Sequence, residues 1–319
     1  MRAQTDGAGG LRHLISLDGL SREALTAILD RAESYRRFPG QPAYEGRELA
    51  GMTLANLFFE PSTRTRASFD LASRRLGAHV LNLDTQSSSR VKGETMLDTI
   101  YTLEAMNADI FVIRDSEPGL PEFLIDHVAP HVSVISAGEA HVSHPTQGLL
   151  DVMTIRSHRR RFAGLKVAIV GDIKHSRVAR STARALRTLG STDLRLVAPQ
   201  SLLPAEEEFQ GAERFTRIED AIQGADVVMM LRIQKERMRE AELPDAERYF
   251  AAWGLTPERL RVARPDAIVM HPQPMNRGIE IASEVADGPQ SVIRDQVRNG
   301  VAVRMAVLED VLTSRGSSA

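Results

Sequence analysis

Residues 58–66, Phe-Phe-Glu-Pro-Ser-Thr-Arg-Thr-Arg, place three hydroxyl groups and two guanidinium groups next to one another. An apolar run, 52–59, leads into this segment, and a helix-patterned run, 67–76, leads out of it. Backbone N–H groups and the helix dipole favour an anion at a helix N-terminus, and hydroxyl and guanidinium groups add hydrogen bonds and charge. Residues 62–66 should lie at a helix N-terminus, and the segment predicts a pocket for a phosphate-bearing ligand. The alternative is a capped surface helix whose arginines extend into solvent.

Other polar side chains follow the ends of further apolar runs: Arg114, His144, Arg177, Arg232 and the pair His271-Pro272. The chain offers more cations than one phosphate needs, and they suit a phosphate plus carboxylates on a second ligand. These cations are Arg64, Arg66, Lys92, Arg114, Arg177, Arg232 and Arg237. His144 could donate to a carbonyl oxygen in an oxyanion-type role, or it could be a hydrogen-bonded core histidine. A proline-locked turn at 272–274 could aim backbone carbonyls at an amine, or it could be a rigid turn only.

Strand and helix patterns alternate along the whole chain. Apolar runs predict strands at 52–59, 78–83, 109–113, 132–135, 165–170, 194–197, 227–231 and 267–270. Helical patterns lie between them, and a last helix from about residue 291 carries an apolar stripe of Val297, Val301, Met305, Leu308 and Leu312. Such alternation predicts parallel sheets covered by helices, with ligands bound beyond the carboxyl ends of the strands. Such ends precede residues 62–66, Arg114, His144, Arg177, Arg232 and His271-Pro272.

The predicted fold class is α/β, with two doubly wound parallel-sheet domains joined by helices. We place the first domain at 1–147 and the second at 148–297, with the C-terminal helix, 298–319, packing back on the first domain. The chain length of 319 residues is enough for two cores of ordinary size.

Composition excludes several classes of protein. A net charge of −2 provides no field for nucleic acid, and the basic run at 156–161 is interpreted as a solvated helix end. The absence of cysteine excludes disulfides and thiolate chemistry and fits a cytoplasmic location. No apolar run is long enough for a membrane span, and residues 1–10 are predicted to be a polar tail, disordered at least in part. We expect no metal and no organic cofactor, and neither nucleotide-binding glycine motif is present.

Residues 58–66 resemble the carbamoyl-phosphate signature of the carbamoyltransferases, and His144-Pro145-Thr146-Gln147 resembles their second shared motif. The similarity extends in order from about His13 to Leu312. Three features are similar to the aspartate branch rather than the ornithine branch of the family. They are the Lys92-Gly93-Glu94 loop, the 231–237 segment, and the His271-Pro272-Gln273-Pro274 turn, where ornithine enzymes usually carry cysteine.

The resemblance implies a role for each matching residue. It implies carbamoyl phosphate binding by Ser62, Thr63, Arg64, Thr65, Ser88, Lys92, Arg114, His144 and Gln147. It implies L-aspartate binding by Lys92, Arg177, Arg232, Gln234 and the backbone carbonyls of Pro272 and Gln273. Catalytic roles fall on Arg64, Thr65, Lys92, Arg114 and His144, and Glu60 would pair with Arg177 and Arg237 on domain closure. Ser88 and Lys92 would reach a neighbouring subunit's site, so a homotrimer with shared active sites is expected, and the Gln273–Pro274 bond would be cis.

The implied reaction transfers the carbamoyl group of carbamoyl phosphate to L-aspartate, giving N-carbamoyl-L-aspartate and phosphate, in de novo pyrimidine (UMP) biosynthesis. Two alternatives remain: a carbamoyltransferase for another amino substrate such as ornithine, and a non-catalytic scaffold of the same fold. In a non-catalytic scaffold we would expect some site residues to have been replaced, whereas every matched position here carries a residue that is compatible with the motif. His175 and Ser176 stand in a variable loop, and Gln273 departs from the usual apolar residue. Regulatory or dihydroorotase-like partner chains are possible, whereas no nucleic acid or membrane partner is expected.

Overall fold

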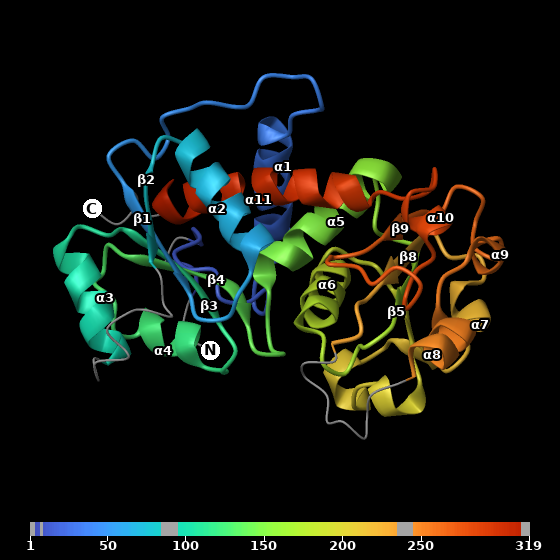
Figure 1. The fold of residues 1–319 in the computed structure, drawn as a ribbon. Coiled ribbons are helices and arrows are strands. Elements are labelled where there is room, and N and C mark those ends of the chain that lie inside the picture. Colours follow the sequence, from blue (N-terminus) through green and yellow to red (C-terminus); the bar gives the residue numbers. More distant parts are fainter. Residues whose placement is uncertain (1–3, 7–8, 84–94, 235–244, 314–319) are drawn as a thin grey trace. The chain divides into compact units, whose positions relative to one another are not determined.

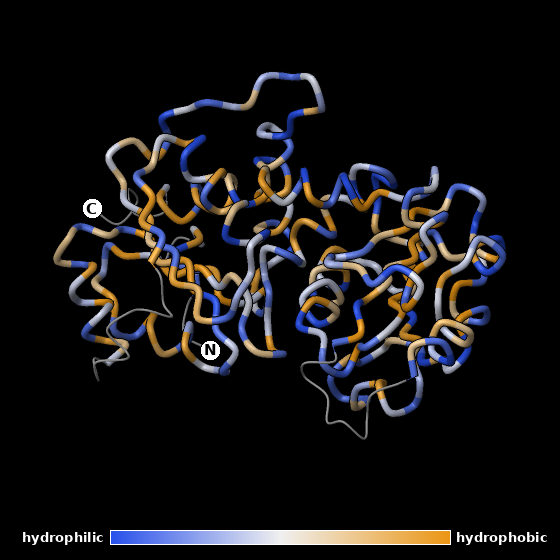
Figure 2. The backbone as a smooth tube through the Cα atoms, viewed as in Figure 1, coloured by the Kyte–Doolittle hydropathy of each residue, from blue (hydrophilic) through white to orange (hydrophobic). Residues whose placement is uncertain are grey.

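The computed structural model describes residues 4–6, 9–83, 95–234 and 245–313. The chain forms two compact units, one of Met1–Thr146 with Arg298–Ala319 and the other of Gln147–Val297. Each unit contains one parallel sheet with helices against it (Figure 1). Hydrophobic residues concentrate along the strands of both sheets (Figure 2). The predicted fold class is therefore confirmed.

The sheet of the first unit has the order β2-β1-β3-β4, with every pairing parallel. Its strands are β1 (Thr53–Phe58), β2 (His79–Leu83), β3 (Ile110–Asp115) and β4 (Ser133–Glu139). The helices are α1 (Arg22–Tyr35), α2 (Thr63–Arg75), α3 (Met96–Ala105) and α4 (Leu120–Ile125), with α2 and α3–α4 on opposite sides of the sheet in Figure 1. The central strands β3 and β4 are buried along their whole length, as expected for a parallel sheet that is covered on both faces.

The C-terminal helix α11 (Ile293–Thr313) joins the first unit from Arg298 onward. Met305 and Leu308 of the predicted stripe are buried, but Val297 is 52% exposed, so the stripe is wrong at its first position. Every residue from Ala302 to Leu308 is buried, so the helix is covered on all sides there and its contact surface is wider than one stripe. Ion pairs also connect this helix to α1, because the Arg31 guanidinium of α1 lies 2.9 Å from the Glu309 carboxylate and 2.6 Å from the Asp310 carboxylate.

The sheet of the second unit has the order β7-β6-β5-β8-β9, again all parallel. Its strands are β5 (Lys166–Val170), β6 (Asp193–Val197), β7 (Glu213–Phe215), β8 (Val227–Met230) and β9 (Ile268–Met270). The helices are α5 (Pro145–Arg159), which spans the boundary between the units, α6 (Arg177–Thr188), α7 (Ile218–Ile222), α8 (Ala246–Trp253), α9 (Pro257–Leu260) and α10 (Ser283–Ala286). Strand β7 is absent from the sequence prediction because a three-residue edge strand carries too little pattern.

Two residues of the N-terminal tail, which was predicted to be disordered at least in part, make defined contacts. Gln4 is buried, and its side chain accepts hydrogen bonds from the backbone N–H groups of Ile15 (2.7 Å) and Ser16 (2.9 Å). Thr5 forms a β-bridge with Leu11. The order of these residues could not be predicted, because composition does not reveal one buried amide that satisfies a loop backbone. Among the described residues, no helix combines the length and the hydropathy needed to cross a membrane.

Candidate active site

The segment that was predicted to bind a phosphate-bearing ligand, residues 58–66, leads into the N-terminus of α2. The helix begins at Thr63, four residues earlier than the predicted 67–76 helix, so Thr63, Arg64 and Thr65 lie in its first turn. The N-cap is Ser62, whose Oγ donates to Thr65 Oγ1 at 3.0 Å instead of accepting from a backbone N–H of the helix. Thr65 is 9% exposed, whereas Thr63 and Arg64 are exposed. A helix N-terminus with this combination of groups attracts an anion.

Arg114 lies beside this segment, at the carboxyl end of β3. Phe58 pairs with Arg114 across β1 and β3, and the Phe59 N–H donates to the Arg114 carbonyl at 2.8 Å. The guanidinium is buried, donates to the Ala137 carbonyl at 3.0 Å, and lies 3.2 Å from a Glu60 carboxylate oxygen. A carbonyl and a carboxylate thus hold a buried cation at the sheet edge. The predicted pairing of Glu60 with Arg177 and Arg237 stays a prediction.

His144 and Gln147 lie on either side of the start of α5. His144 is buried and directly precedes Pro145, which opens the helix as proline does at a first helical position. Gln147 is also buried, and its amide nitrogen donates to Asp151 Oδ1 at 2.9 Å. Residues 144–147 therefore lie at the N-terminus of α5, just as residues 62–65 lie at the N-terminus of α2.

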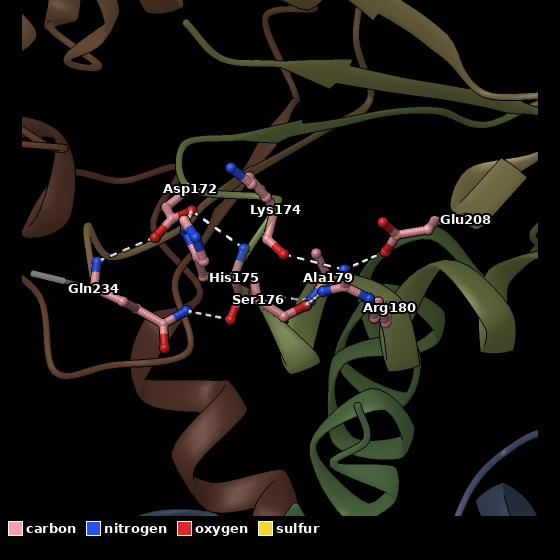
Figure 3. A network of polar contacts seen from close by, with 8 residues as sticks. All are labelled: Asp172, Lys174, His175, Ser176, Ala179, Arg180, Glu208 and Gln234. Carbon is pink, nitrogen blue, oxygen red and sulfur yellow. Dashed lines mark hydrogen bonds and ion pairs between the residues drawn. The ribbon is translucent and has the colours of Figure 1, made fainter. Parts of the chain in front are cut away.

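In the second unit, the loop after β5 is organised around the buried carboxylate of Asp172 (Figure 3). Its Oδ1 lies 2.8 Å from His175 Nδ1, and its Oδ2 accepts from the Gln234 backbone N–H at 3.4 Å. The Gln234 side-chain amide donates in turn to the His175 carbonyl at 3.1 Å. Burial raises the pKa of Asp172 above its usual value, although His175 opposes the shift. These contacts connect the ends of the neighbouring strands β5 and β8.

Gly171 permits this close approach of the two strand ends. Its φ is +125°, and a Cβ at this position would lie 2.7 Å from the Leu231 carbonyl oxygen. Both the backbone conformation and the contact therefore require glycine.

Arg177 is the first residue of α6 and is buried. The helix is capped by Ser176, whose Oγ accepts from the Ala179 N–H at 3.1 Å. Arg180, one turn along, donates to the Lys174 carbonyl at 3.0 Å and also pairs with Glu208 (Figure 3). Hydrogen bonds therefore stabilise the chain both before Arg177, at Lys174 and Ser176, and after it, at Ala179 and Arg180.

The His271-Pro272-Gln273-Pro274 turn follows β9. The Gln273–Pro274 peptide bond is cis, as the resemblance predicted. The Gln273 N–H donates to His271 Nδ1 at 2.9 Å, so the imidazole proton resides on Nε2, which lies 3.2 Å from Glu280 Oε1. Pro272 and Gln273 are half-buried, whereas His271 and Glu280 are buried.

Of the remaining predicted site residues, the structure describes Arg232 but not the other three. Arg232 is half-buried and follows β8, within the segment that leads to Gln234. Ser88, Lys92 and Arg237 lie outside the described residues. Sequence reasoning gave no role to Asp172, Arg180 or Asp151, although the Asp172 carboxylate directly follows a strand end. Within the described parts of the chain, no group of three or more His, Cys, Asp or Glu residues is arranged to hold a metal ion.

Helix N-termini, arginines and hydroxyls at the carboxyl ends of parallel strands are typical of α/β proteins that bind anionic ligands. Two family models match consecutive parts of the sequence. The carbamoyl-phosphate-binding domain of aspartate/ornithine carbamoyltransferases matches residues 12–157, and their Asp/Orn-binding domain matches residues 163–311. The chain belongs to the aspartate/ornithine carbamoyltransferase family.

Solved structures from both branches of this family are similar to the chain. Aspartate transcarbamoylase from Trypanosoma cruzi in complex with carbamoyl aspartate and phosphate is 31% identical, with a TM-score of 0.83 over 94% of this chain and 96% of that chain. The same enzyme with N-(phosphonacetyl)-L-aspartic acid is 29% identical, with a TM-score of 0.86 over 97% and 98%. Ornithine carbamoyltransferase from Thermus thermophilus is 28% identical, with a TM-score of 0.83 over 94% and 99%. Overall similarity therefore supports the family and does not separate the two acceptor substrates.

Proposed function

We propose that the chain transfers the carbamoyl group of carbamoyl phosphate to the amino group of L-aspartate, giving N-carbamoyl-L-aspartate and phosphate. The observation that carries this proposal is the pair of arginines, Arg177 and Arg232, after the neighbouring strands β5 and β8. L-Aspartate offers two carboxylates, and guanidinium groups bind carboxylates with bidentate geometry. The side chain of ornithine ends in an ammonium group, which a second arginine would repel. The arginine pair thus favours the dicarboxylate.

The first unit supplies the groups that suit carbamoyl phosphate. The N-terminus of α2, with Ser62, Thr63, Arg64 and Thr65, suits the phosphate. Arg114 and His144, buried at the ends of β3 and before α5, would donate to the carbamoyl oxygen. Each such donor contributes about 3 kcal/mol to stabilising the oxyanion of a tetrahedral intermediate. Gln147 would contact the carbamoyl amide.

In the proposed mechanism, the aspartate amine attacks the carbamoyl carbon, and the oxyanion forms against Thr65, Arg114 and His144. The carbon–oxygen bond to phosphate then breaks, and the departing charge is held by Arg64 and the α2 N-terminus. The phosphate dianion itself is proposed to take the amine proton. Alignment of the two substrates would provide much of the rate. The backbone carbonyls of Pro272 and Gln273 would accept hydrogen bonds from the amine.

The catalytic unit is proposed to be a homotrimer in which Ser88 and Lys92 complete the site of a neighbouring subunit. Its product would enter de novo pyrimidine synthesis in the cytoplasm. This assembly follows from the family resemblance of the 88–94 segment. Light scattering of the purified chain measures its mass in solution, and a monomer with full activity would contradict a shared site.

The test of function is phosphate release from carbamoyl phosphate with either L-aspartate or L-ornithine as acceptor. We expect release with L-aspartate, and Arg232→Ala should raise the KM for L-aspartate while leaving the KM for carbamoyl phosphate near its original value. Release with L-ornithine alone would assign the chain to the other branch, which the Thermus thermophilus similarity keeps as the second candidate. No release with either amino acid would contradict the proposal.

A further inference from the structure

A buried carboxylate, Asp151 of α5, connects three segments of the second unit. It has no exposed surface, and no role was assigned to it from the sequence. Its Oδ1 accepts from Gln147 Nε2 at 2.9 Å and from Gln296 Nε2 at 2.9 Å, and its Oδ2 accepts from Thr182 Oγ1 at 2.7 Å. Thr182 and Gln296 are themselves buried. Three donors on one buried carboxylate form a fully connected polar network, which fixes the geometry of each donor.

The first connection sets the orientation of the Gln147 amide. An ionised carboxylate only accepts hydrogen bonds, so the nitrogen of Gln147 must face Asp151. The carbonyl oxygen of Gln147 is therefore the end that points away from this contact. An acceptor suits the amide N–H groups of a carbamoyl group, whereas a donor would repel them.

The second connection reaches the turn after β9. Gln296, whose nitrogen faces Asp151, accepts from the His271 backbone N–H through its Oε1 at 2.8 Å. His271 accepts from the Gln273 N–H, and its Nε2–H faces Glu280. The carboxylate of Asp151 thus fixes the Gln296 amide, and Gln296 holds the start of the turn that carries the Pro272 and Gln273 carbonyls.

The third connection reaches α6 through Thr182. Arg177, the proposed partner of an aspartate carboxylate, is the first residue of the same helix. A buried hydroxyl bound to a buried carboxylate resists rotation or sliding of α6, because either motion would leave both groups without their bond.

We propose that Asp151 is a positioning residue that aligns Gln147, Arg177 and the 271–274 turn for the reaction. This proposal rests on the proposed function for the identity of the ligands. Loss of the carboxylate leaves the substrate-contacting groups in place but loosens them, and misplacement by about 1 Å costs on the order of 10²-fold in rate.

The experiment compares variants that cut the network at different points. Asp151→Leu removes every acceptor, and we expect kcat/KM to fall about 10²-fold. Asp151→Asn keeps an acceptor for the two glutamines and can donate to Thr182, so it should recover most of that loss. Gln296→Met cuts only the branch to the turn, and we expect about a 10-fold increase in the KM for the amino acid with little change for carbamoyl phosphate. Thr154→Val is the control, because its buried hydroxyl donates to the Leu150 carbonyl of the same helix at 2.7 Å.

The outcomes separate positioning from stability and from the proposed function. Variants that lower Tm but retain wild-type kcat and KM below it would show a structural role only and would overturn the proposal. Wild-type protein that releases phosphate with neither amino acid would contradict the proposed function instead. In that case a crystal structure of Gln296→Met still tests the network: displacement of the 271–274 turn supports it, and an unmoved turn overturns it. If Asp151→Leu does not fold, Asp151→Asn and Gln296→Met provide the same comparison.

Discussion

The imidazole of His175 lies 2.8 Å from the carboxylate of Asp172, and this pair connects the loop before Arg177 to the Gln234 backbone. Asp172 is buried, and burial raises its pKa. The charged carboxylate is nevertheless the form that accepts hydrogen bonds from both segments. The pair therefore sets the relative position of the two loops that follow β5 and β8.

Asp172→Asn tests this relationship. The amide removes the charge that holds His175, so we expect the KM for L-aspartate to rise about 10-fold while the KM for carbamoyl phosphate changes little. Because the pKa of Asp172 is raised, acidification protonates this group before an ordinary aspartate, and wild-type KM for L-aspartate should rise on the acidic side. The variant should lose that dependence. Steady-state kinetics between pH 5 and 8 measure both effects.

The control for this substitution is Asp193→Asn. Asp193 begins β6 and pairs with Arg195, at the end of the sheet opposite the loops. It should leave both KM values unchanged. Equal effects of the two substitutions would attribute the change to general loss of stability.

Arg114→Lys tests the forked contact at the end of β3. The guanidinium donates to Ala137 and lies against Glu60 through different nitrogens, and a lysine ammonium cannot reproduce this geometry. We expect kcat to fall by about 10²–10³-fold, the effect of losing one oxyanion donor. Arg74→Lys is the matched control, because Arg74 pairs with Asp70 on an exposed helix face and should leave kcat unaffected. A variant at Arg114 with normal kcat would contradict the proposal that Arg114 contacts the carbamoyl oxygen.

The strand ends, and the polar residues that follow them, could be predicted from the sequence. Apolar runs followed by polar clusters located Arg114, His144 and Arg177 at the carboxyl edges of the sheets, because strand periodicity is a local property. Residues 62–66 do lie at a helix N-terminus, as predicted, but the helix-patterned run was taken to begin at Ala67 rather than Thr63, since hydroxyl and proline residues around Ser62 indicate a turn as readily as a helix start.

The partners of the site residues could not be predicted from the sequence. Asp151 and Gln296 are separated by 145 positions, and their hydrogen bond depends on how α5 and α11 pack. Asp172 and Gln234 meet only because β5 and β8 are neighbours in the sheet, an order that alternation alone does not specify. Val297 was assigned to the buried stripe from its spacing, yet it is exposed because it lies before the stretch 302–308 in which every residue of the helix is buried.

Asp310 should make the stability of the first unit depend on pH. Burial, with Glu309 beside it, raises its pKa from 3.8 to about 6, although Arg31 opposes the shift. A raised pKa in the folded state gives stability that is present below the unfolded value and is lost as pH rises through about 6. Asp310→Asn should therefore gain stability relative to wild type between pH 4 and 7, as measured by urea unfolding. Asp98→Asn should show the opposite sign, because hydrogen bonds from Thr95 lower the pKa of Asp98. The same sign for both variants would contradict this account of Asp310.

Subunit mixing tests whether Lys92 acts in a neighbouring site. Arg64 lies in the first turn of α2, where we propose that it binds the phosphate, so Arg64→Ala should reduce kcat/KM by at least about 10²-fold. Lys92→Ala should be similarly inactive. In a trimer with shared sites, mixing the two inactive proteins under exchanging conditions places both substitutions in some sites and neither in others. We expect phosphate release to recover to a measurable fraction of wild type. Mixing Arg64→Ala with Arg114→Lys is the control, since both residues would belong to one subunit's half of the site and no intact site could form. Recovery in the control as well would point to a contaminating activity, and no recovery in either mixture would place Lys92 in the site of its own subunit.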